Sequence, residues 1–478
     1  MGGSVRYESD SGDIVMALTG ESPINRAVSV FREPNFLKLV ELLRTADVSF
    51  TNLEGVLQDE NYVDPPTSVG GGDSLGTHLA VPPWCIDELR WLGIDLVSTA
   101  NNHALDFGEQ GLLSNIRYLQ QARMPFAGTG ANLAEARSAT YLDTPAGRVA
   151  LLAAADYGPR GKGAPQYHYP LGFMAGAQSP YLRGRPGVSL LRHRTVFTVD
   201  AQAFGTLRRI NKELGLAPDR PLTTEEKVAE GWNPTRDGVN WGLLDYPDET
   251  DASAIFMDTE FELGDEFAMR TVPDERDLRD ILKWVGDARR MADWVIFSFH
   301  DHGASRSRDL PSDHAVTLAH AAIDAGADVY IGHGALRDRG IEIYEGRPIV
   351  YSLGNFFRQN QTARRAPSEV MELYGLGNDA TPADFQDAKR ASGHGPVRPE
   401  SWETAVVRVE FRERELRGLR IYPVDVGRGA SRGSAGRPIL AEEDGAVYGS
   451  VLDRIERCSE PFGTVLERGP GHGYVKLP

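Results

Sequence analysis

The stretch STANNHALDFG, residues 98–108, joins a strand-like segment to a helix-like segment. Residues 92–97 before it have the apolar content and length of a buried strand, and residues 112–119 after it repeat apolar side chains at helical spacing. Asn101, Asn102 and His103 therefore follow a predicted strand, at the edge where open α/β sheets bind ligands. Asn also caps helices frequently, so Asn101 or Asn102 taken alone has that simpler interpretation.

The alternation of apolar runs and helical segments extends to both sides of this stretch. Strands are predicted at residues 14–18, 48–50, 148–154, 294–299 and 328–331, and helices at 36–43, 278–291 and 315–325. This pattern is typical of a layered α/β fold. The alternation is lost between residues 156 and 272, where Gly, Pro, Tyr and Arg are frequent.

We expect four parts along the chain. Residues 11–155 and 273–426 would form the two halves of one core, and residues 156–272 a cap that is inserted between them. A polar, mobile loop is expected at 359–402, and a C-terminal extension at 427–478. A cap of this kind would cover a ligand site, although a solvated surface loop is the simpler interpretation of its basic segment, residues 183–194.

Composition excludes several classes of partner. The 478 residues have a formal net charge of −17, which disfavours binding to nucleic acid or to an anionic membrane. Cys85 and Cys458 make no disulfide framework and fit a reducing compartment. No stretch approaches the roughly 18 apolar residues of a membrane span, and residues 1–12 lack the apolar core of a signal peptide. We therefore expect a cytoplasmic protein.

Metal-ligand residue types stand next to five of the predicted strands. They are Asp13, Asn52 with Glu54, Asn102 with His103, His300 with His302, and His333. Carboxylate, amide and imidazole groups together bind hard or borderline divalent cations. Each residue alone has a simpler explanation as a cap, a solvated loop residue or a structural histidine, but five such coincidences favour a metal or polar catalytic site.

Six short motifs resemble the CapA family of poly-γ-glutamate synthesis proteins. They are GD at 12–13, NLEG at 52–55, ANNHALDFG at 100–108, GAD at 326–328, GHG at 332–334 and YSLGNF at 351–356. The resemblance covers roughly residues 11–154 and 275–357. It implies a calcineurin-like metallophosphoesterase fold, a four-layer α/β sandwich with metals on its strand-end loops.

The departures from the family pattern concern the metal. The His-x-His pair is followed by Gly303 where the family carries an acidic residue, and Ala335 and Leu336 stand where a second histidine is expected. The first-strand motif also lacks a histidine. The resemblance then implies one divalent ion, Ca²⁺ or Mn²⁺, rather than two. The predicted ligands are Asp13, Glu54, Asn102, His300 and His333.

Within the family, the eroded ligands and the large insertion are similar to a branch of lasso-peptide epimerases. That resemblance implies inversion at Cα of the C-terminal residue of a ribosomal precursor peptide, which would be the binding partner. Epimerisation needs two proton-transfer groups on opposite faces of one carbon. His103 with Asp106 would supply one, and His300 or His302, paired with Asp13 across the sheet, the other.

Several points stay open on the sequence alone. Either His300 or His302 could bind the metal while the other moves a proton, and Arg337 or Arg339 could meet the carboxylate of the peptide. The alternative function is a metal-dependent phosphoesterase or related hydrolase in poly-γ-glutamate or capsule synthesis. A non-catalytic role in polyglutamate export is a third possibility. The oligomeric state and the peptide are not determined.

Overall fold

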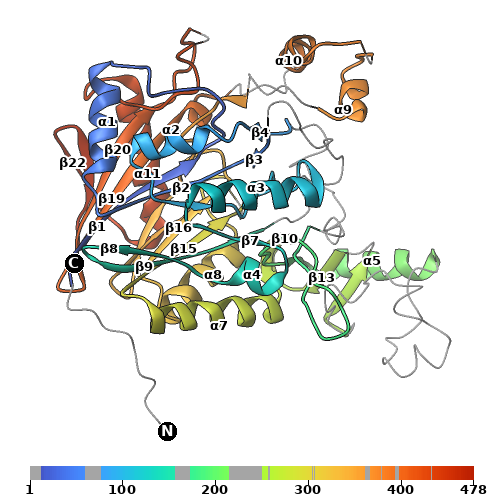
Figure 1. Ribbon diagram of the computed structural model, residues 1–478. Helices are drawn as coiled ribbons and strands as arrows, with labels where there is room; N and C mark the ends of the chain where they lie inside the picture. Colours follow the sequence, from blue (N-terminus) through green and yellow to red (C-terminus); the bar gives the residue numbers. More distant parts are fainter. Residues whose placement is uncertain are drawn as a thin grey trace.

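Two large β-sheets lie face to face in the computed structural model (Figure 1). The structure describes residues 12–59, 77–156, 173–214, 250–256, 259–303, 305, 307–360, 366–377, 379–392, 398–431 and 433–477. The first sheet has nine strands, in the order β22 (Leu466–Gly469), β23 (His472–Val475), β20 (Glu415–Asp425), β19 (Glu403–Arg412), β1 (Ile14–Glu21), β2 (Val48–Asn52), β5 (Leu96–Ser98) and β6 (Phe126–Ala127), with β21 (Ile439–Leu440) beside β20. Strands β1, β2, β5 and β6 run parallel.

The second sheet has six strands. Their order is β17 (Ile341–Tyr344), β18 (Arg347–Val350), β16 (Val329–His333), β15 (Trp294–His300), β9 (Gly147–Ala155) and β8 (Thr140–Thr144). Strands β9, β15, β16 and β18 are parallel, so their carboxyl ends meet at one edge. Parallel strands buried on both faces have nearly continuous apolar sequences, as WVIFSF in β15 does.

Successive side chains along the central strands enter different cores. Met16 of β1 and Ile296 of β15 face the space between the sheets, whereas Ala17 and Phe297 face outward. Each fully buried Met, Ile or Phe side chain of this kind stabilises the fold by about 1.5–3 kcal/mol. Because successive side chains of a strand point to opposite faces of the sheet, each central strand packs against the other sheet on one face and against helices on the other.

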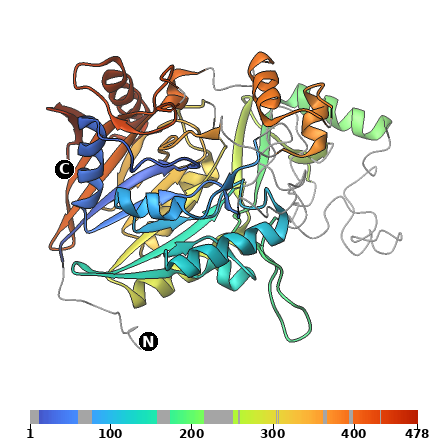
Figure 2. The ribbon, with the colours of Figure 1, turned by 45° about the horizontal axis from the view of Figure 1, so that its top comes forward.

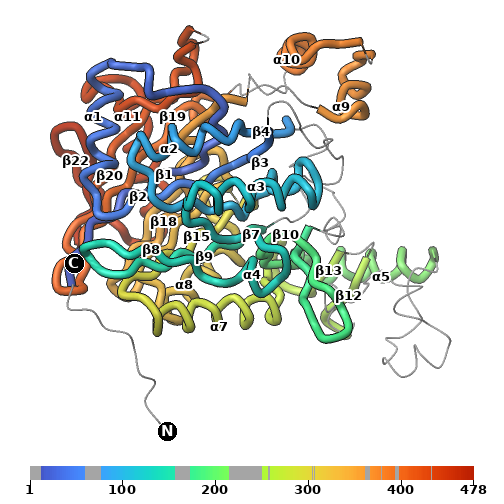
Figure 3. Tube along the Cα trace, viewed as in Figure 1, coloured from blue at the N-terminus to red at the C-terminus, as the bar shows by residue number. Residues whose placement is uncertain are grey.

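Helices cover the outer face of each sheet. Helices α1 (Pro34–Arg44) and α2 (Cys85–Leu92) pack on the first sheet, and α7 (Glu275–Met291) and α8 (Asp313–Asp324) pack on the second. Figure 3 shows α2 towards the top and α7 along the bottom, with the strands between them. The layers therefore run helix, sheet, sheet, helix, and the predicted α/β class is confirmed.

Local sequence explains why α7 begins where it does. The Asp274 carboxylate accepts hydrogen bonds from the backbone N–H groups of Arg276 (3.0 Å) and Asp277 (3.1 Å), which have no partner within the helix. Ile281 and Val285 then face β15 one helical turn apart. The helix starts three residues before the predicted position because the cap precedes the apolar periodicity.

Much of the described part of residues 156–272 forms a small sheet of its own. Its strands have the order β12 (Ser253–Phe256), β13 (Thr259–Leu263), β11 (His193–Val199) and β14 (Ala268–Pro273), and α5 (Ala201–Glu213) packs against it. Figure 2 shows this sheet and α5 at one side of the two large sheets. Its role as a cap stays a prediction.

Smaller elements complete the chain. They are β3 (Val56–Leu57), β4 (Ala80–Val81), α3 (Gly108–Ala122), β7 (Thr129–Gly130), α4 (Leu133–Arg137), β10 (Gly187–Val188), α9 (Ser368–Leu373), α10 (Pro382–Ala391), η2 (Pro399–Trp402), α11 (Ala446–Ser459) and η3 (Glu460–Phe462).

The segment 359–402, predicted as a polar and mobile loop, contains α9, α10 and η2, and its mobility stays a prediction. Thr381 and Asp384 cap α10 reciprocally, and Phe385 is buried. Among the helices of the described ranges, none has both the length and the apolar content to cross a bilayer.

Candidate metal centre

The carboxyl ends of strands from both sheets meet at one polar site. Asn101 Nδ2 donates to Leu53 O (2.9 Å), which joins the ends of β5 and β2. Across the gap between the sheets, the amide oxygen of Asn102 lies 3.2 Å from His302 Nε2. Nearly all side chains of the site are buried, including Glu21, Asn52, Glu54, Asn101, Asn102, His103, Asp106, His300 and His333.

Three of these side chains have the spacing of metal ligands. One ligand atom each of Glu54, His300 and His302 lies within 4.8 Å of the others. The Nε2 atoms of His300 and His302 are 3.0 Å apart. Atoms that bind one octahedral ion at about 2.1 Å lie roughly 3 Å from each other, so this separation fits two neighbouring ligands.

Asn102 adds an amide oxygen beside His302, so the donor set has two oxygens and two imidazole nitrogens. A mixed set of this kind fits a borderline divalent ion such as Mn²⁺ better than Ca²⁺, which prefers oxygen ligands only. The residues present therefore fit the metal that the sequence predicts, with His302 in addition to the predicted Glu54, Asn102 and His300.

His333 lies behind His300. Its Nδ1 is 3.0 Å from His300 Nδ1, and its Nε2 is 2.8 Å from the Ser298 hydroxyl. Burial lowers the pKa of His333 to about 3, so the ring is neutral at pH 7. Both ring nitrogens of His333 face protein groups, so this residue can orient His300, and its predicted role as a direct metal ligand stays a prediction.

The His-Asp-His triplet that follows β15 alternates between two environments. His300 and His302 face the metal centre, whereas Asp301 points away and accepts a hydrogen bond from Ser312 Oγ at 2.6 Å. Consecutive side chains of an extended backbone point to opposite sides, so the Asp301 carboxylate cannot orient the imidazole of His300 or of His302. Neither histidine pairs with Asp13 as predicted.

His103 and Asp106 lie together as predicted. His103 Nδ1 is 2.7 Å from Asp106 Oδ2, and the same oxygen accepts a hydrogen bond from the backbone N–H of Leu79 at 2.7 Å. An ionised Asp106 accepts only, so it places the proton on His103 Nδ1. His103 Nε2 is left facing the site, 3.7 Å from the Glu54 carboxylate.

Asn101 is not a helix cap. Its side chain bonds to Leu53 O and to the amide oxygen of Asn52 (3.2 Å), and helix α3 starts seven residues later, at Gly108. Residues 101–107 instead form turns that carry Asn102 and His103 into the site. The simpler interpretation of Asn101 is therefore wrong.

Asp13 does not belong to this site. It precedes β1, at the opposite end of the strand from the ligand edge, and its side chain is half-exposed. Its carboxylate accepts hydrogen bonds from the Glu413 backbone N–H (2.8 Å) and from Arg412 (3.2 Å), which hold its pKa below the usual value. The prediction that Asp13 is a ligand and a proton-transfer partner is wrong.

Glu21 occupies the position that the sequence reasoning assigned to Asp13. It ends β1, is fully buried, and accepts a hydrogen bond from the Gly334 backbone N–H next to His333. Gly20 precedes it because a Cβ there would lie 1.8 Å from the carbonyl oxygen of Gly354. The sequence could have indicated Glu21, because the ligand residues of a parallel sheet follow its strands and do not precede them.

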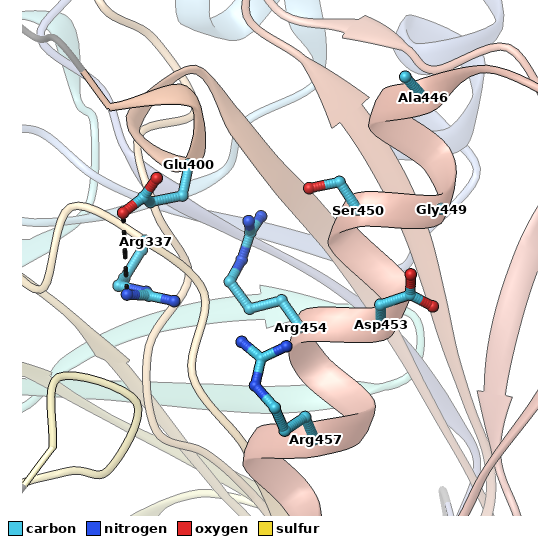
Figure 4. Close-up of a pocket in the computed structure, with 8 residues that line it drawn as sticks. All are labelled: Arg337, Glu400, Ala446, Gly449, Ser450, Asp453, Arg454 and Arg457. Carbon is cyan, nitrogen blue, oxygen red and sulfur yellow. Dashed lines mark ion pairs between the residues drawn. The ribbon is translucent and has the colours of Figure 1, made fainter.

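The two arginines proposed for a substrate carboxylate are engaged elsewhere. Arg337 lies 2.7 Å from Asp309 and 3.8 Å from Glu400, and it lines a cavity of about 580 Å³ beside α11 (Figure 4). None of the proposed metal ligands lines that cavity. Arg339 is buried, 3.8 Å from Asp301. Neither prediction is supported by the geometry.

Among the described residues, Arg358 brings a cation near Glu21 and Glu54 of the site. Burial lowers the pKa of its guanidinium to about 10, and the charges of Glu21 and Glu54 oppose that shift. The guanidinium also lies 5.4 Å from the ring centre of Trp402. Sequence reasoning missed Arg358, although it follows the YSLGNF motif by two residues.

Comparison with known proteins agrees with the motifs. The model of the family "Bacterial capsule synthesis protein PGA_cap" matches residues 11–360. The uncharacterized protein y4uA of Sinorhizobium fredii is 32% identical over 475 residues, which cover 97% of this chain and 93% of that protein. The PGA biosynthesis protein CapA of Bacillus subtilis is 34% identical over 122 residues, covering 24% of this chain and 30% of that protein.

The capsule biosynthesis protein CapA of Bacillus anthracis is 21% identical over 386 residues, covering 79% of this chain and 66% of that protein. The relation to lasso-peptide epimerases stays a prediction. Because the family model matches most of the chain, the protein belongs to the bacterial capsule synthesis family PGA_cap, which includes the CapA proteins.

Proposed function

We propose that the chain is a divalent-metal-dependent hydrolase of the phosphoesterase type that acts in the synthesis of poly-γ-glutamate or a related capsule polymer. The observation that carries this proposal is the group formed by Glu54, His300 and His302, whose ligand atoms lie within 4.8 Å at the shared edge of two sheets. The family and the printed names of the CapA relatives support the biological setting.

The helix, sheet, sheet, helix layers agree with the calcineurin-like architecture that the motifs imply, and we include that architecture in the proposal. The metal, when bound by Glu54, His300, His302 and Asn102, would polarise a phosphoryl or carbonyl oxygen and lower the pKa of a bound water. Mn²⁺ fits these donors best.

The other residues of the site have roles that follow from their positions. His103 Nε2 faces the site while Nδ1 is held by Asp106, so His103 can accept or return a proton at Nε2. Arg358 lies near Glu21 and Glu54 and would attract an anionic substrate group to the site. His333 and Ser298 keep His300 in place.

A second function, the peptide epimerase, is favoured by one specific feature. Two imidazoles approach the Glu54 carboxylate, namely His103, steadied by Asp106, and His302. Two such groups could remove and return a proton on opposite faces of a Cα atom. The substrate would then be a precursor peptide that binds through its C-terminus.

One set of assays separates these functions. Hydrolysis of p-nitrophenyl phosphate and bis-p-nitrophenyl phosphate is measured with Mn²⁺, and deuterium uptake at Cα is measured in D₂O with peptides of varied C-terminal residue. Metal-dependent ester hydrolysis that disappears in His302→Gln but survives in His320→Gln supports the hydrolase. His320 is the matched control because it pairs with Glu342 instead (3.0 Å).

Deuterium uptake without ester hydrolysis would establish the epimerase and reject the hydrolase. If the Mn²⁺-loaded protein shows neither reaction, the proposal of a phosphoesterase-type hydrolase is wrong for this chain.

A further inference from the structure

A second group of metal-ligand side chains lies beside the candidate metal centre. Asp156 follows β9, His193 begins β11 and His314 lies in the first turn of α8. One ligand atom of each lies within 4.8 Å of the others, and all three side chains are buried. None of them was singled out as a ligand by the sequence, and none belongs to the centre described above.

The geometry of this group brings three donor atoms towards one place. The Asp156 carboxylate lies 3.0 Å from His193 Nδ1 through one oxygen and 3.5 Å from His314 Nε2 through the other. The two imidazole rings are stacked, with centres 4.1 Å apart and planes inclined by 5°. Parallel rings that both direct a nitrogen at one carboxylate are arranged as neighbouring ligands of an ion.

The surroundings call for a cation. Within the described ranges, Asp156 forms ion pairs with these two imidazoles and with no arginine or lysine. A second carboxylate, that of Asp301, lies 3.9 Å from His314 Nε2. A buried carboxylate is stable only beside a positive charge or a dense set of hydrogen-bond donors.

A proton on His314 could also supply that charge: burial lowers the pKa of this imidazole, but the carboxylates of Asp156 and Asp301 raise it above the usual value overall. His314 is fully buried, and its Nδ1 has no hydrogen-bond partner among the described residues. An imidazole that binds an ion through Nε2 carries its proton on Nδ1, as an imidazolium also does, so the group is compatible with either a bound ion or a bound proton. A neutral imidazole keeps a lone pair, which is the form that binds a metal ion.

We propose that Asp156, His193 and His314 bind a structural divalent ion of the Zn²⁺ class, distinct from the ion of the candidate metal centre. Two imidazoles and a carboxylate are a ligand set that Zn²⁺ takes. The three residues come from the core strand β9, the inserted sheet and helix α8, so the ion joins the insertion to the core. It also lies next to the first centre, because the Asp156 backbone N–H donates to His300 O at 2.8 Å.

The test is metal analysis of full-length variants. Glu54→Gln weakens the first centre, His193→Gln removes a ligand of the second, and His320→Gln is the control for loss of an imidazole. After dialysis against EDTA and reloading with Zn²⁺, the wild-type and His320→Gln proteins should bind two ions per chain. Glu54→Gln and His193→Gln should each bind one, and the double variant none.

Two further measurements do not depend on the folding of the His193 variant. Co²⁺ added to Glu54→Gln should give the visible absorption of a low-coordinate site with nitrogen ligands. Zn²⁺ should raise the melting temperature of Glu54→Gln, and EDTA should reverse that rise. If Glu54→Gln binds no ion, gives no Co²⁺ absorption and melts at the same temperature with and without Zn²⁺, the second site does not bind metal and a buried proton holds the group together.

Discussion

Replacing Asp106 with Asn tests whether the His103–Asp106 pair serves the reaction rather than the metal. Asp106 is fully buried, and one of its oxygens accepts hydrogen bonds from His103 Nδ1 and Leu79 N, both at 2.7 Å. Its other oxygen has no partner within the described ranges. Asn keeps the volume and removes the charge, so the change isolates the electrostatic contribution.

The size of the effect follows from these contacts. Hydrogen bonds to an ionised group contribute about 1.5–3 kcal/mol and neutral ones about 1 kcal/mol, so the two bonds lose roughly 1–4 kcal/mol together. The amide N–H₂ of Asn would then lie where the partnerless oxygen is now. We expect a folded protein with a lower denaturation midpoint.

The effect on turnover should be larger than the effect on stability. Without the carboxylate, His103 loses the group that fixes its proton on Nδ1 and stabilises its charged form, and general acid–base catalysis contributes about 10²–10⁴-fold. We therefore expect kcat with the responsive substrate to fall by about 100-fold or more. The content of bound Mn²⁺ should stay unchanged, because Asp106 is not among the proposed ligands.

The assay is kcat and metal content measured on the same preparation. Glu342→Gln is the matched control, because Glu342 pairs with His320 at 3.0 Å and neither residue belongs to the candidate metal centre. Turnover of Asp106→Asn within threefold of wild type would refute the role of the pair. Loss of metal in parallel with turnover would show that the pair acts on metal binding instead.

Three further predictions test the site and its surroundings. Glu54→Gln should weaken Mn²⁺ binding by about 10-fold or more, measured by calorimetry, because the carboxylate is the charged member of the ligand group; unchanged affinity would exclude Glu54 as a ligand. Asp13→Asn should change the free energy of unfolding by about 0.5 kcal/mol or less and leave metal binding intact, since its side chain is half-exposed and distant along β1; loss of metal would restore the original assignment. Burial raises the pKa of Cys458 to about 11, so at pH 8 only about 0.1% of it is thiolate and iodoacetamide should label it slowly until the protein unfolds; rapid labelling of the folded protein at pH 8 would contradict the burial.

Local patterns in the sequence were enough to identify the core elements and part of the site. The apolar run of β15 and the helical periodicity of α7 depend on neighbours a few residues away, which periodicity records directly. The same holds for His103 and Asp106, which lie three residues apart and meet in the structure. Asn102 and His300 were found because each stands where its own strand ends.

Only the tertiary structure decided which strand ends meet and which polar residue each contributes. The sequence around β1 offers Asp13 at one end and Glu21 at the other, and the direction of the strand in the sheet selects Glu21. Arg358 reaches the site from a loop far along the chain.

The group of Asp156, His193 and His314 shows the same limit most clearly. Its members lie 37 and 121 residues apart in the sequence and come from a strand end, the inserted sheet and a helix. Each has an unremarkable neighbourhood, because no local period links residues that only meet after the sheets and helices have packed. The sequence by itself determined the α/β class and the chemistry available, and the packing of distant segments determined where that chemistry is assembled.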